Sequence, residues 1–93
     1  MRTIRRTARF KKDYKRESSG RHGATLAHDL REVVSLLIAD TPLAASYHDH
    51  GLAGIWRDHR DCHIKPDLVL LYRKPDGENL DLVRLGSHSE LGL

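Results

Sequence analysis

Histidines are the residues most able to do chemistry in this sequence. Four of its seven histidines fall within sixteen positions, at His48, His50, His59 and His63. Because the unperturbed pKa of imidazole lies near neutrality, these side chains can accept and donate protons at cellular pH. For any single histidine, a place on the surface with no chemical task is the simpler interpretation. The cluster as a whole predicts a site of proton transfer.

Cleavage of RNA by internal attack is a reaction that this segment could support. The reaction needs a base to take the proton of the 2′-hydroxyl and an acid to protonate the leaving 5′-oxygen. It also needs cations to offset the charge that develops on the phosphorane. The histidines lie among acidic and basic side chains suited to these tasks: Arg57, Arg60, Asp61, Lys65 and Asp67.

A metal site is the rival interpretation. His48-x-His50 and Asp61-x-His63 place pairs on one side of an extended chain, and histidine with carboxylate suits zinc or iron. Neither spacing is specific, and the sequence has no helical H-E-x-x-H pattern, so we expect no functional metal ion and no cofactor. The single cysteine, Cys62, cannot form an internal disulfide. Its place on the apolar side of the local alternation predicts a small core residue rather than a nucleophile.

Basic residues are concentrated at the start of the chain. Residues 1–16 hold eight Lys or Arg and one acid, whereas the remaining residues hold eight bases and twelve acids. A basic segment of this density attracts phosphate irrespective of sequence and speeds encounter with a polyanion. A solvated helix face is the alternative, but we favour nucleic acid as the partner. Without a long apolar run, the chain is expected to be cytoplasmic and to have no membrane segment.

The first half of the chain predicts one strand and two helices. Phe10 and Tyr14 are four residues apart, which is typical of one face of a helix, and Thr7 is suited to cap its start. Apolar residues farther on follow the spacing of an amphipathic helix, which a proline ends. An edge strand is predicted at residues 2–7, followed by a helix from residue 8 to a loop at 18–23. A second helix is predicted at about 24–39.

In the second half the periodicity changes to two after a connecting segment at 43–54. The alternation over Ile55–Ile64 predicts a strand with Trp56 on its apolar face and four polar side chains on the other: Arg57, His59, Asp61 and His63. A second strand is predicted at 68–72, a turn at 75–77 and a third strand at 80–85. A short tail follows at 86–93.

Together these elements predict a single α+β domain over residues 1–93. Their order is β-α-α-β-β-β, with the helical hairpin packed on one face of a mainly antiparallel sheet. The polar face of the strand over Ile55–Ile64 is then the open face of that sheet, where chemistry is expected. A chain of 93 residues buries a modest core, so a shallow groove suits it better than a deep active site.

Two motifs resemble those of a known family. Asp49 to Tyr72 read D-H-x-L-x-G-x-W-x-x-x-R-D-x-H-x-x-P-D-x-x-L-x-Y, and Arg84 to Leu91 read R-x-G-[ST]-H-x-x-L. These patterns and the order of elements closely resemble the YafQ branch of the RelE/ParE toxin superfamily over nearly the whole chain. The resemblance implies a RelE-like, microbial-RNase-like fold and a toxin of a type II toxin–antitoxin system. It also implies metal-independent cleavage of mRNA in the ribosomal A site, and a toxin that is monomeric alone but joins a hetero-oligomer with its cognate antitoxin.

The resemblance also implies a catalytic set of four residues: His50, His63, Asp67 and His88. We expect His50 and His63 to act as an acid/base pair, with Asp67 orienting one imidazole or sharing the role of base. His88 would contact the scissile phosphate or protonate the leaving oxygen.

Other side chains are expected to contact RNA. By the same resemblance Asp61 and Trp56 line the site, while Arg60 and Arg84 are candidates for stabilising phosphate charge. Gly92 stands where the family often has an aromatic residue, so Trp56 or another ring would have to stack on the base. The basic helix would bind ribosomal RNA through its exposed side chains: Lys11, Lys12, Lys15 and Arg16.

Two other functions are compatible with the same fold. ParE-like relatives inhibit a topoisomerase and lack this histidine set, so the histidines argue against that function. The other alternative is a catalytically inactive protein that binds RNA. Loss of growth inhibition in His63→Ala or His88→Ala would favour the nuclease over both.

Overall fold

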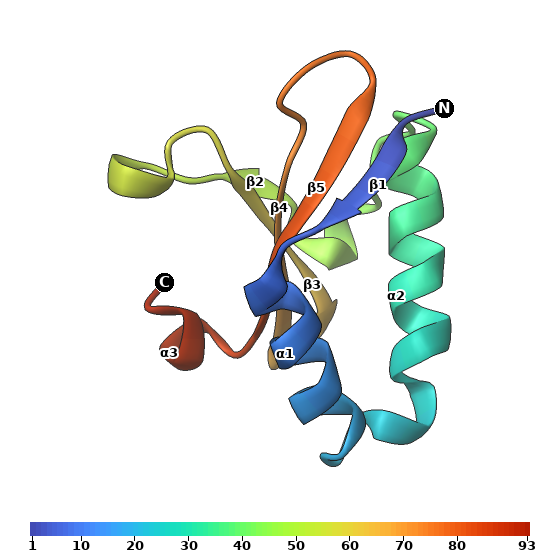
Figure 1. The fold of residues 1–93 in the computed structure, drawn as a ribbon, viewed down its shortest axis with the longest axis vertical. Helices are drawn as coiled ribbons and strands as arrows, with labels where there is room; N and C mark the ends of the chain where they lie inside the picture. Colours follow the sequence, from blue (N-terminus) through green and yellow to red (C-terminus); the bar gives the residue numbers. More distant parts are fainter.

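A five-stranded sheet forms the middle of the protein (Figure 1). The structure is a computed structural model that describes residues 1–93. Strand β1 is parallel to β5, and the other neighbours are antiparallel, in the order β1-β5-β4-β3-β2. The predicted α+β class with a mainly antiparallel sheet is confirmed. The elements in chain order are β1 (Thr3–Arg6), α1 (Ala8–Ser18), α2 (Gly23–Ile38), the 3-10 helix η1 (Ala45–Tyr47), β2 (His50–Gly51), the 3-10 helix η2 (Gly54–Trp56), β3 (Arg60–Lys65), β4 (Leu68–Arg73), β5 (Asn79–Gly86) and α3 (His88–Leu91).

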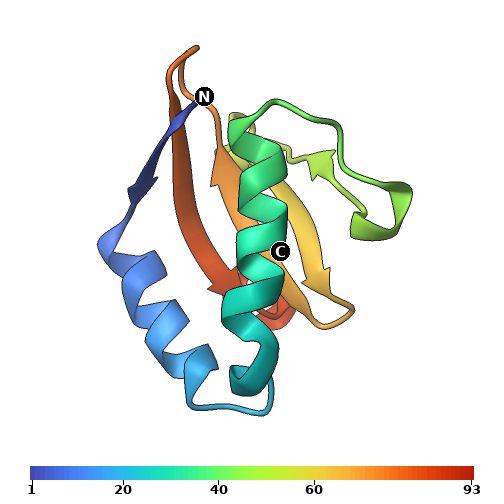
Figure 2. The same ribbon diagram turned by 90° about the vertical axis from the view of Figure 1, so that its right-hand side faces the viewer.

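Helices α1 and α2 form the predicted hairpin on one face of the sheet (Figure 2). Thr7 caps α1, because its hydroxyl oxygen accepts a hydrogen bond from the backbone N–H of Phe10 at 3.0 Å. The apolar stripe of α2 is buried, and with Phe10 and the inward residues of β3, β4 and β5 it forms one core of 14 buried residues. None of the helices combines the length and the apolar character needed to cross a membrane.

The strand predicted over residues 55–64 is shorter than expected, because β3 begins at Arg60. Gly54 has a positive φ of 66° and starts the turn η2. The backbone N–H groups of Arg57 and His59 then bond within this turn, at 3.2 and 2.8 Å. The alternation before Arg60 therefore belongs to a loop, and the prediction that Arg57 and His59 share a strand face with the later residues was wrong.

A fifth strand, β2, was not predicted. Its two residues, His50 and Gly51, pair with Asp61 and Arg60 of β3. Two residues are too few to produce a periodic pattern in the sequence. The pairing matters for the site because it places His50 directly opposite Asp61 at the edge of the sheet.

The tail predicted over residues 86–93 contains a helical turn, α3, on the face opposite α1 and α2 (Figure 1). A capping box starts it: Ser87 Oγ accepts from the N–H of Glu90 at 3.1 Å, and the Glu90 carboxylate accepts from the N–H of Ser87 at 2.9 Å. Leu91 packs on the outward residues of β4. The predicted tail therefore contains a third helix outside the hairpin, and the serine and glutamate of the capping box were the overlooked signal.

Where β1 ends, α1 takes over the hydrogen bonding along the edge of β5. Thr7 donates to two carbonyl groups of β5, through its N–H at 3.1 Å and its hydroxyl at 2.7 Å. Farther along, Asp13 accepts from the N–H of Leu85 at 3.0 Å, and Arg16 donates to the carbonyl of Leu85 at 2.9 Å. Helix α1 therefore satisfies backbone groups that a longer β1 would otherwise have bonded.

Candidate active site

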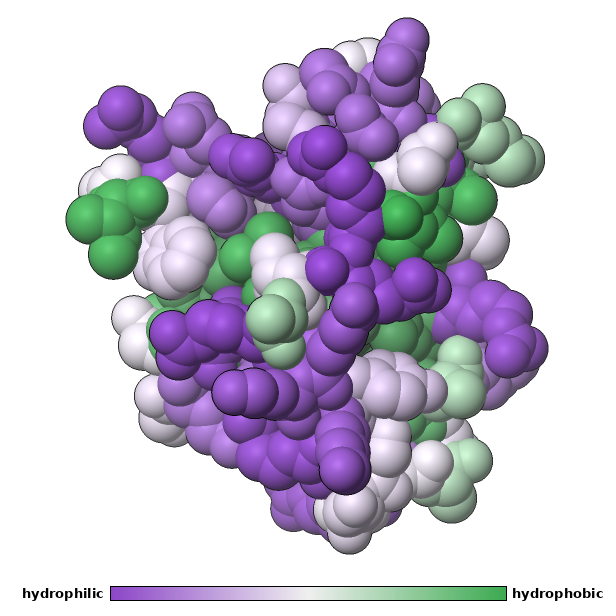
Figure 3. All heavy atoms as spheres, in the orientation of Figure 1, coloured by the Kyte–Doolittle hydropathy of each residue, from purple (hydrophilic) through white to green (hydrophobic).

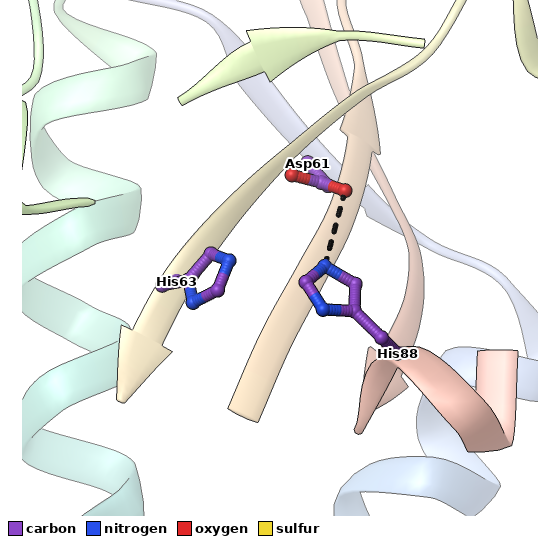
Figure 4. Close-up of side chains that lie close together, drawn as sticks. All are labelled: Asp61, His63 and His88. Carbon is purple, nitrogen blue, oxygen red and sulfur yellow. Dashed lines mark ion pairs between the residues drawn. The ribbon is translucent and has the colours of Figure 1, made fainter. Parts of the chain in front are cut away.

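Three elements bring polar side chains together on the face that α1 and α2 leave open. The alternation of β3 turns its apolar residues into the core and places Asp61 and His63 on the other side. His50 enters from β2, and His88 enters from the first position of α3. Figure 4 shows Asp61 and His63 on β3 with His88 extending toward them from α3.

Asp61 lies between two imidazoles. Its Oδ1 is 3.1 Å from His50 Nδ1, and its Oδ2 is 3.6 Å from His88 Nε2. The His88 ring lies edge-on to that of His63 with centroids 5.0 Å apart, and His48 follows at 5.2 Å from His63. The structure thus gathers three of the four predicted catalytic residues around one carboxylate.

The Asp61 side chain is only 1% exposed, although the neighbouring histidines are not buried. Its Oδ1 has no aligned hydrogen bond, because His50 Nδ1 bonds to the carbonyl oxygen of His48 at 2.7 Å. A buried carboxylate that lacks hydrogen bonds is unfavourable unless a positive charge lies beside it. The arrangement therefore places a buried acceptor beside two imidazoles.

Backbone carbonyl groups fix the tautomers of two imidazoles. His50 Nδ1 lies 2.7 Å from the carbonyl oxygen of His48, and His63 Nδ1 lies 3.3 Å from that of Pro66. Because a carbonyl oxygen only accepts hydrogen bonds, Nδ1 carries the proton in each ring. The Nε2 atom of each neutral ring is then able to accept a proton.

Trp56 lies on the open side of the sheet rather than in the main core. Its indole packs against β4 and α3, and the ring meets that of His59 edge-on with centroids 5.0 Å apart. Trp56 also lines an open hollow of about 380 Å³ together with His50, Asp61 and His88. A half-buried indole in this position has a ring on which a base can stack.

Gly92 follows α3 with a positive φ of 71°, and it lines the same hollow next to Leu93. Neither residue carries a ring, so Trp56 is the aromatic residue that lines the hollow.

Asp67 does not join the row of imidazoles. It lies in the turn between β3 and β4, and its carboxylate pairs with Arg21 and, at 2.9 Å, with Nε2 of His22 at the start of α2. A register shift near the end of β3 accompanies this turn toward α2. No hydrogen bond or ion pair links Asp67 to the three imidazoles. The expected orienting role is therefore limited to an indirect path through Pro66, whose carbonyl holds His63.

The two arginines expected to stabilise phosphate are already paired within the protein. Arg60 lies on the helical face of β3 and donates twice to Asp49 at 3.3 Å. Its alternation with Asp61 was a signal that it faces away from the site. Arg84 donates twice to Asp13, at 2.7 and 3.3 Å, and its side chain is 15% exposed. Neither guanidinium is free at the row of imidazoles.

The basic residues of α1 divide into two groups. Lys11, Lys12 and Lys15 are exposed, and hydrophilic side chains cover the surface over α1 (Figure 3). Arg16 is also exposed, but its guanidinium is fixed because it donates to Asp13 and to the carbonyl of Leu85. Asp13 was not predicted to have a role, although a lone acid three residues after buried Phe10 was the available signal.

One group of side chains has the donors for a metal ion. Asp61, His63 and His88 each offer a ligand atom, and these atoms lie within 4.8 Å of one another. One carboxylate with two imidazoles suits a first-row transition metal. Since the same side chains form the row described above, a bound ion would compete with proton transfer there.

This fold and its open histidine-lined face define the class to which the protein belongs. The sequence matches the model of the family described as "Bacterial toxin of type II toxin-antitoxin system, YafQ" over residues 2–92. The chain belongs to this family of toxins, and the resemblance seen in the two sequence motifs is confirmed.

Relatives and solved structures agree with this membership. The mRNA interferase toxin YafQ of Escherichia coli strain B / BL21-DE3 is 37% identical over 91 residues, which cover 97% of this chain and 95% of that protein. A copper-bound mutant toxin from Helicobacter pylori has a similar structure, with a TM-score of 0.84 and 38% identity over 98% of this chain and 99% of that chain. A chain of the E. coli DinJ–YafQ complex aligns with a TM-score of 0.79 and 32% identity over 98% of each chain.

Proposed function

We propose that this toxin is an endoribonuclease that cuts mRNA in the A site of the ribosome by acid/base catalysis. The observation that carries the proposal is the row of His50, His63 and His88 around the buried carboxylate of Asp61. Proton donors and acceptors gathered in this way are what cleavage by internal attack needs. The name of the E. coli relative, mRNA interferase, supports the same class of reaction.

The tautomers and the buried carboxylate suggest a role for each imidazole. His63 accepts the proton of the 2′-hydroxyl at Nε2, and the resulting oxyanion attacks the phosphorus. The P–O5′ bond breaks, and His88, which lies beside Asp61, gives a proton to the leaving oxygen. The products are a 2′,3′-cyclic phosphate and a 5′-hydroxyl. Since the two rings are 5.0 Å apart, they can contact oxygens on opposite sides of one phosphate.

His50 and Trp56 have supporting roles in this proposal. His50 lies on the other side of Asp61 from His88, where a second imidazole can stabilise charge on the phosphorane. Trp56 stacks on a base and sets the position of the neighbouring phosphate.

The shape of the site favours a substrate that a larger assembly holds in place. The hollow is open, and both candidate arginines are paired, so the protein alone offers few contacts to align mRNA for in-line attack. The exposed side chains of Lys11, Lys12 and Lys15 bind ribosomal RNA and hold the toxin in the decoding centre. A cognate antitoxin neutralises the toxin, and the E. coli DinJ–YafQ complex supports such a partner.

A translation extract with a defined mRNA tests this function. Wild-type toxin should give discrete cleavage products that carry a 5′-hydroxyl and that appear only when ribosomes are present. His63→Ala and His88→Ala should each lower the cleavage rate by at least about 100-fold, the usual contribution of a general acid or base. His28→Ala, in an exposed histidine of α2, is the matched control. Intact mRNA together with blocked DNA supercoiling would instead support a ParE-like function.

A chelator arm decides whether a metal takes part. Acid/base catalysis by the imidazoles predicts the same cleavage rate with and without chelator, provided that the ribosomes stay intact. Added copper should slow cleavage, because Asp61, His63 and His88 would bind it and no longer transfer protons. Activity that disappears with chelator and returns with metal would overturn the acid/base mechanism.

A further inference from the structure

Asp13 is a buried acid in the basic helix α1, and several groups donate hydrogen bonds to its carboxylate. It is 3% exposed and accepts hydrogen bonds from Arg84 at 2.7 and 3.3 Å, from the N–H of Leu85 at 3.0 Å and from Arg16 at 3.0 Å. Burial by itself raises the pKa of Asp13, but the hydrogen bonds from Arg84 and Leu85 outweigh burial and hold this pKa below its ordinary value. Asp13 is therefore ionised and fixed in position at neutral pH.

Arg16 extends these contacts from α1 to α3. Besides Asp13, it bonds to the carbonyl of Leu85 at 2.9 Å, and its Nε lies 3.5 Å from the carboxylate of Glu90. Glu90 is also the capping-box residue of α3. One arginine thus connects the buried acid, the end of β5 and the helix that carries His88.

Gly86 is the residue that allows this approach. A Cβ atom at this position would lie 2.9 Å from Nη2 of Arg16 and 3.3 Å from Oε1 of Glu90. Any other residue here would move the arginine or α3. The glycine, the arginine at 84 and the serine cap at 87 are all parts of the terminal motif, and each has a structural task in placing the histidine that follows.

The position of α3 depends on such contacts because the helix is very short. It spans His88–Leu91, and a helix of one turn is unstable without tertiary contacts. His88 must nevertheless lie close to Asp61 and His63 for the proposed proton transfer. An error of about 1 Å in such an arrangement lowers a reaction rate by about 100-fold.

Acidic side chains surround both guanidinium groups of this cluster. Arg84 pairs with Asp13, and Arg16 pairs with Asp13, with Glu17 at 3.0 Å and with Glu90 at 3.5 Å. Arg84 donates to Asp13 through both Nε and Nη2, so its charge is already paired with a carboxylate. These contacts therefore indicate that Arg84 positions other residues of the protein rather than binding RNA directly.

We infer that Asp13, Arg84 and Arg16 form a positioning cluster that holds α3 so that His88 meets Asp61 and His63. The inference rests on the proposed function for its effect on catalysis. It replaces the expectation that Arg84 stabilises phosphate charge and that Arg16 contacts RNA.

Single-turnover cleavage of ribosome-bound mRNA tests the cluster. Asp13→Asn and Arg84→Lys should each lower the maximal rate by about 10- to 100-fold, because they loosen α3. The toxin concentration at half-saturation should stay within about twofold, since neither residue contacts the ribosome. The double variant should be no slower than about the slower single variant, because both changes disrupt one unit. Glu32→Gln, in an exposed acid of α2, is the matched control.

A direct phosphate role for Arg84 predicts a different pattern. Asp13→Asn would then free the arginine and leave the rate unchanged or higher, whereas Arg84→Lys alone would lower it. That result would overturn the inference. If circular dichroism shows that Asp13→Asn does not fold, Glu90→Gln takes its place, because glutamine keeps the capping box but loses the charge next to Arg16.

An NMR readout separates this inference from the proposed function. In Asp13→Asn the ring signals of His88 should shift, while those of His28 on α2 stay unchanged. Wild-type toxin that fails to cut mRNA would refute the proposed function, and the NMR shift would still decide the positioning role. Wild-type cleavage together with unmoved His88 signals would refute the positioning cluster alone.

Discussion

The two histidines that flank Asp61 lie in contrasting surroundings. His88 depends on Asp13, which is 3% exposed and bonded by groups from α1 and β5. On the His50 side, the preceding residue Asp49 accepts a hydrogen bond from the hydroxyl of Tyr72 at 2.6 Å and longer ones from Arg60 at 3.3 Å. The side chain of Asp49 is 23% exposed. The carboxylate of Asp13 is the buried support, whereas that of Asp49 borders on solvent.

This difference indicates that the two sides of the site differ in rigidity. Burial strengthens a satisfied ionic group and makes its disruption costly, whereas exposure leaves a similar group weak and adaptable. The His88 end is therefore expected to be rigid before substrate binds, while the two-residue strand β2 leaves His50 freer to adjust. In both supports an arginine that looked suited to phosphate proves to bond an aspartate.

The largest expected effect comes from removing the buried support. Asp13→Ala should lower the free energy of unfolding by about 3 kcal/mol, because it leaves a partly buried guanidinium without its counter-charge. Urea denaturation measures this loss. Asp29→Ala, which breaks the more exposed pair with Lys65, should lose less than about 1 kcal/mol. Equal losses in the two variants would contradict the special status of Asp13.

A smaller effect is expected on the His50 side of Asp61. Tyr72→Phe removes the hydroxyl that bonds Asp49, and the free energy of unfolding should fall by about 1 kcal/mol because Arg60 still bonds the acid. Cleavage of ribosome-bound mRNA should slow less than in Arg84→Lys. If Tyr72→Phe proves the slower enzyme, the assignment of the rigid end to His88 is wrong.

Acid should act on the buried support through the lowered pKa of Asp13. Burial raises this pKa, but the bonds from Arg84 and Leu85 lower it more, so the folded value lies below the ordinary 3.8. Such a group contributes its full stabilisation above the unfolded-state pKa and loses it as the pH falls through the folded value. The difference in unfolding free energy between wild type and Asp13→Asn should thus be constant from pH 7 to 5 and shrink below about pH 4. A difference that grows in acid would contradict this.

The mildest change should appear in the reactivity of Cys62. This thiol is buried in β3, and burial raises its pKa to about 12, so native toxin should react very slowly with thiol reagents. Tyr72→Phe should speed the labelling because it loosens the neighbouring edge of the sheet, whereas Arg84→Lys should not. Mass spectrometry after timed labelling gives both rates. Equal acceleration in the two variants would show that the supports are not independent.

The regular elements were the part of the fold that the sequence predicted well. The apolar stripe of α2, the Thr7 cap of α1 and the buried run of β4 each have a local cause, and each was confirmed. The two-residue strand β2 and the turn at Gly54 have no periodicity, so they were missed. Strand β2 depends on its pairing with Arg60 and Asp61 of β3, and the turn depends on local backbone hydrogen bonds.

The site followed the same division. His50 and His63 belonged to a visible cluster, whereas His88 was placed only by the resemblance of its motif to a family, because tertiary contacts bring it 25 residues back to His63. The internal pairing of Arg84 was missed for a related reason. Its partner, Asp13, is 71 residues away, and no local pattern reveals such a pairing.

The parallel pairing of β1 with β5 has a consequence for the order in which the protein folds. Thr3 aligns with Asn79 in this ladder, so β1 must wait for a strand that is synthesised much later. Contacts between such distant segments form slowly, and a nascent chain that lacks β5 also lacks core residues Leu80, Leu82 and Leu85. His88 follows directly after that strand. While residues 79–88 are still inside the ribosome that makes them, the face on which His88 meets Asp61 therefore does not exist.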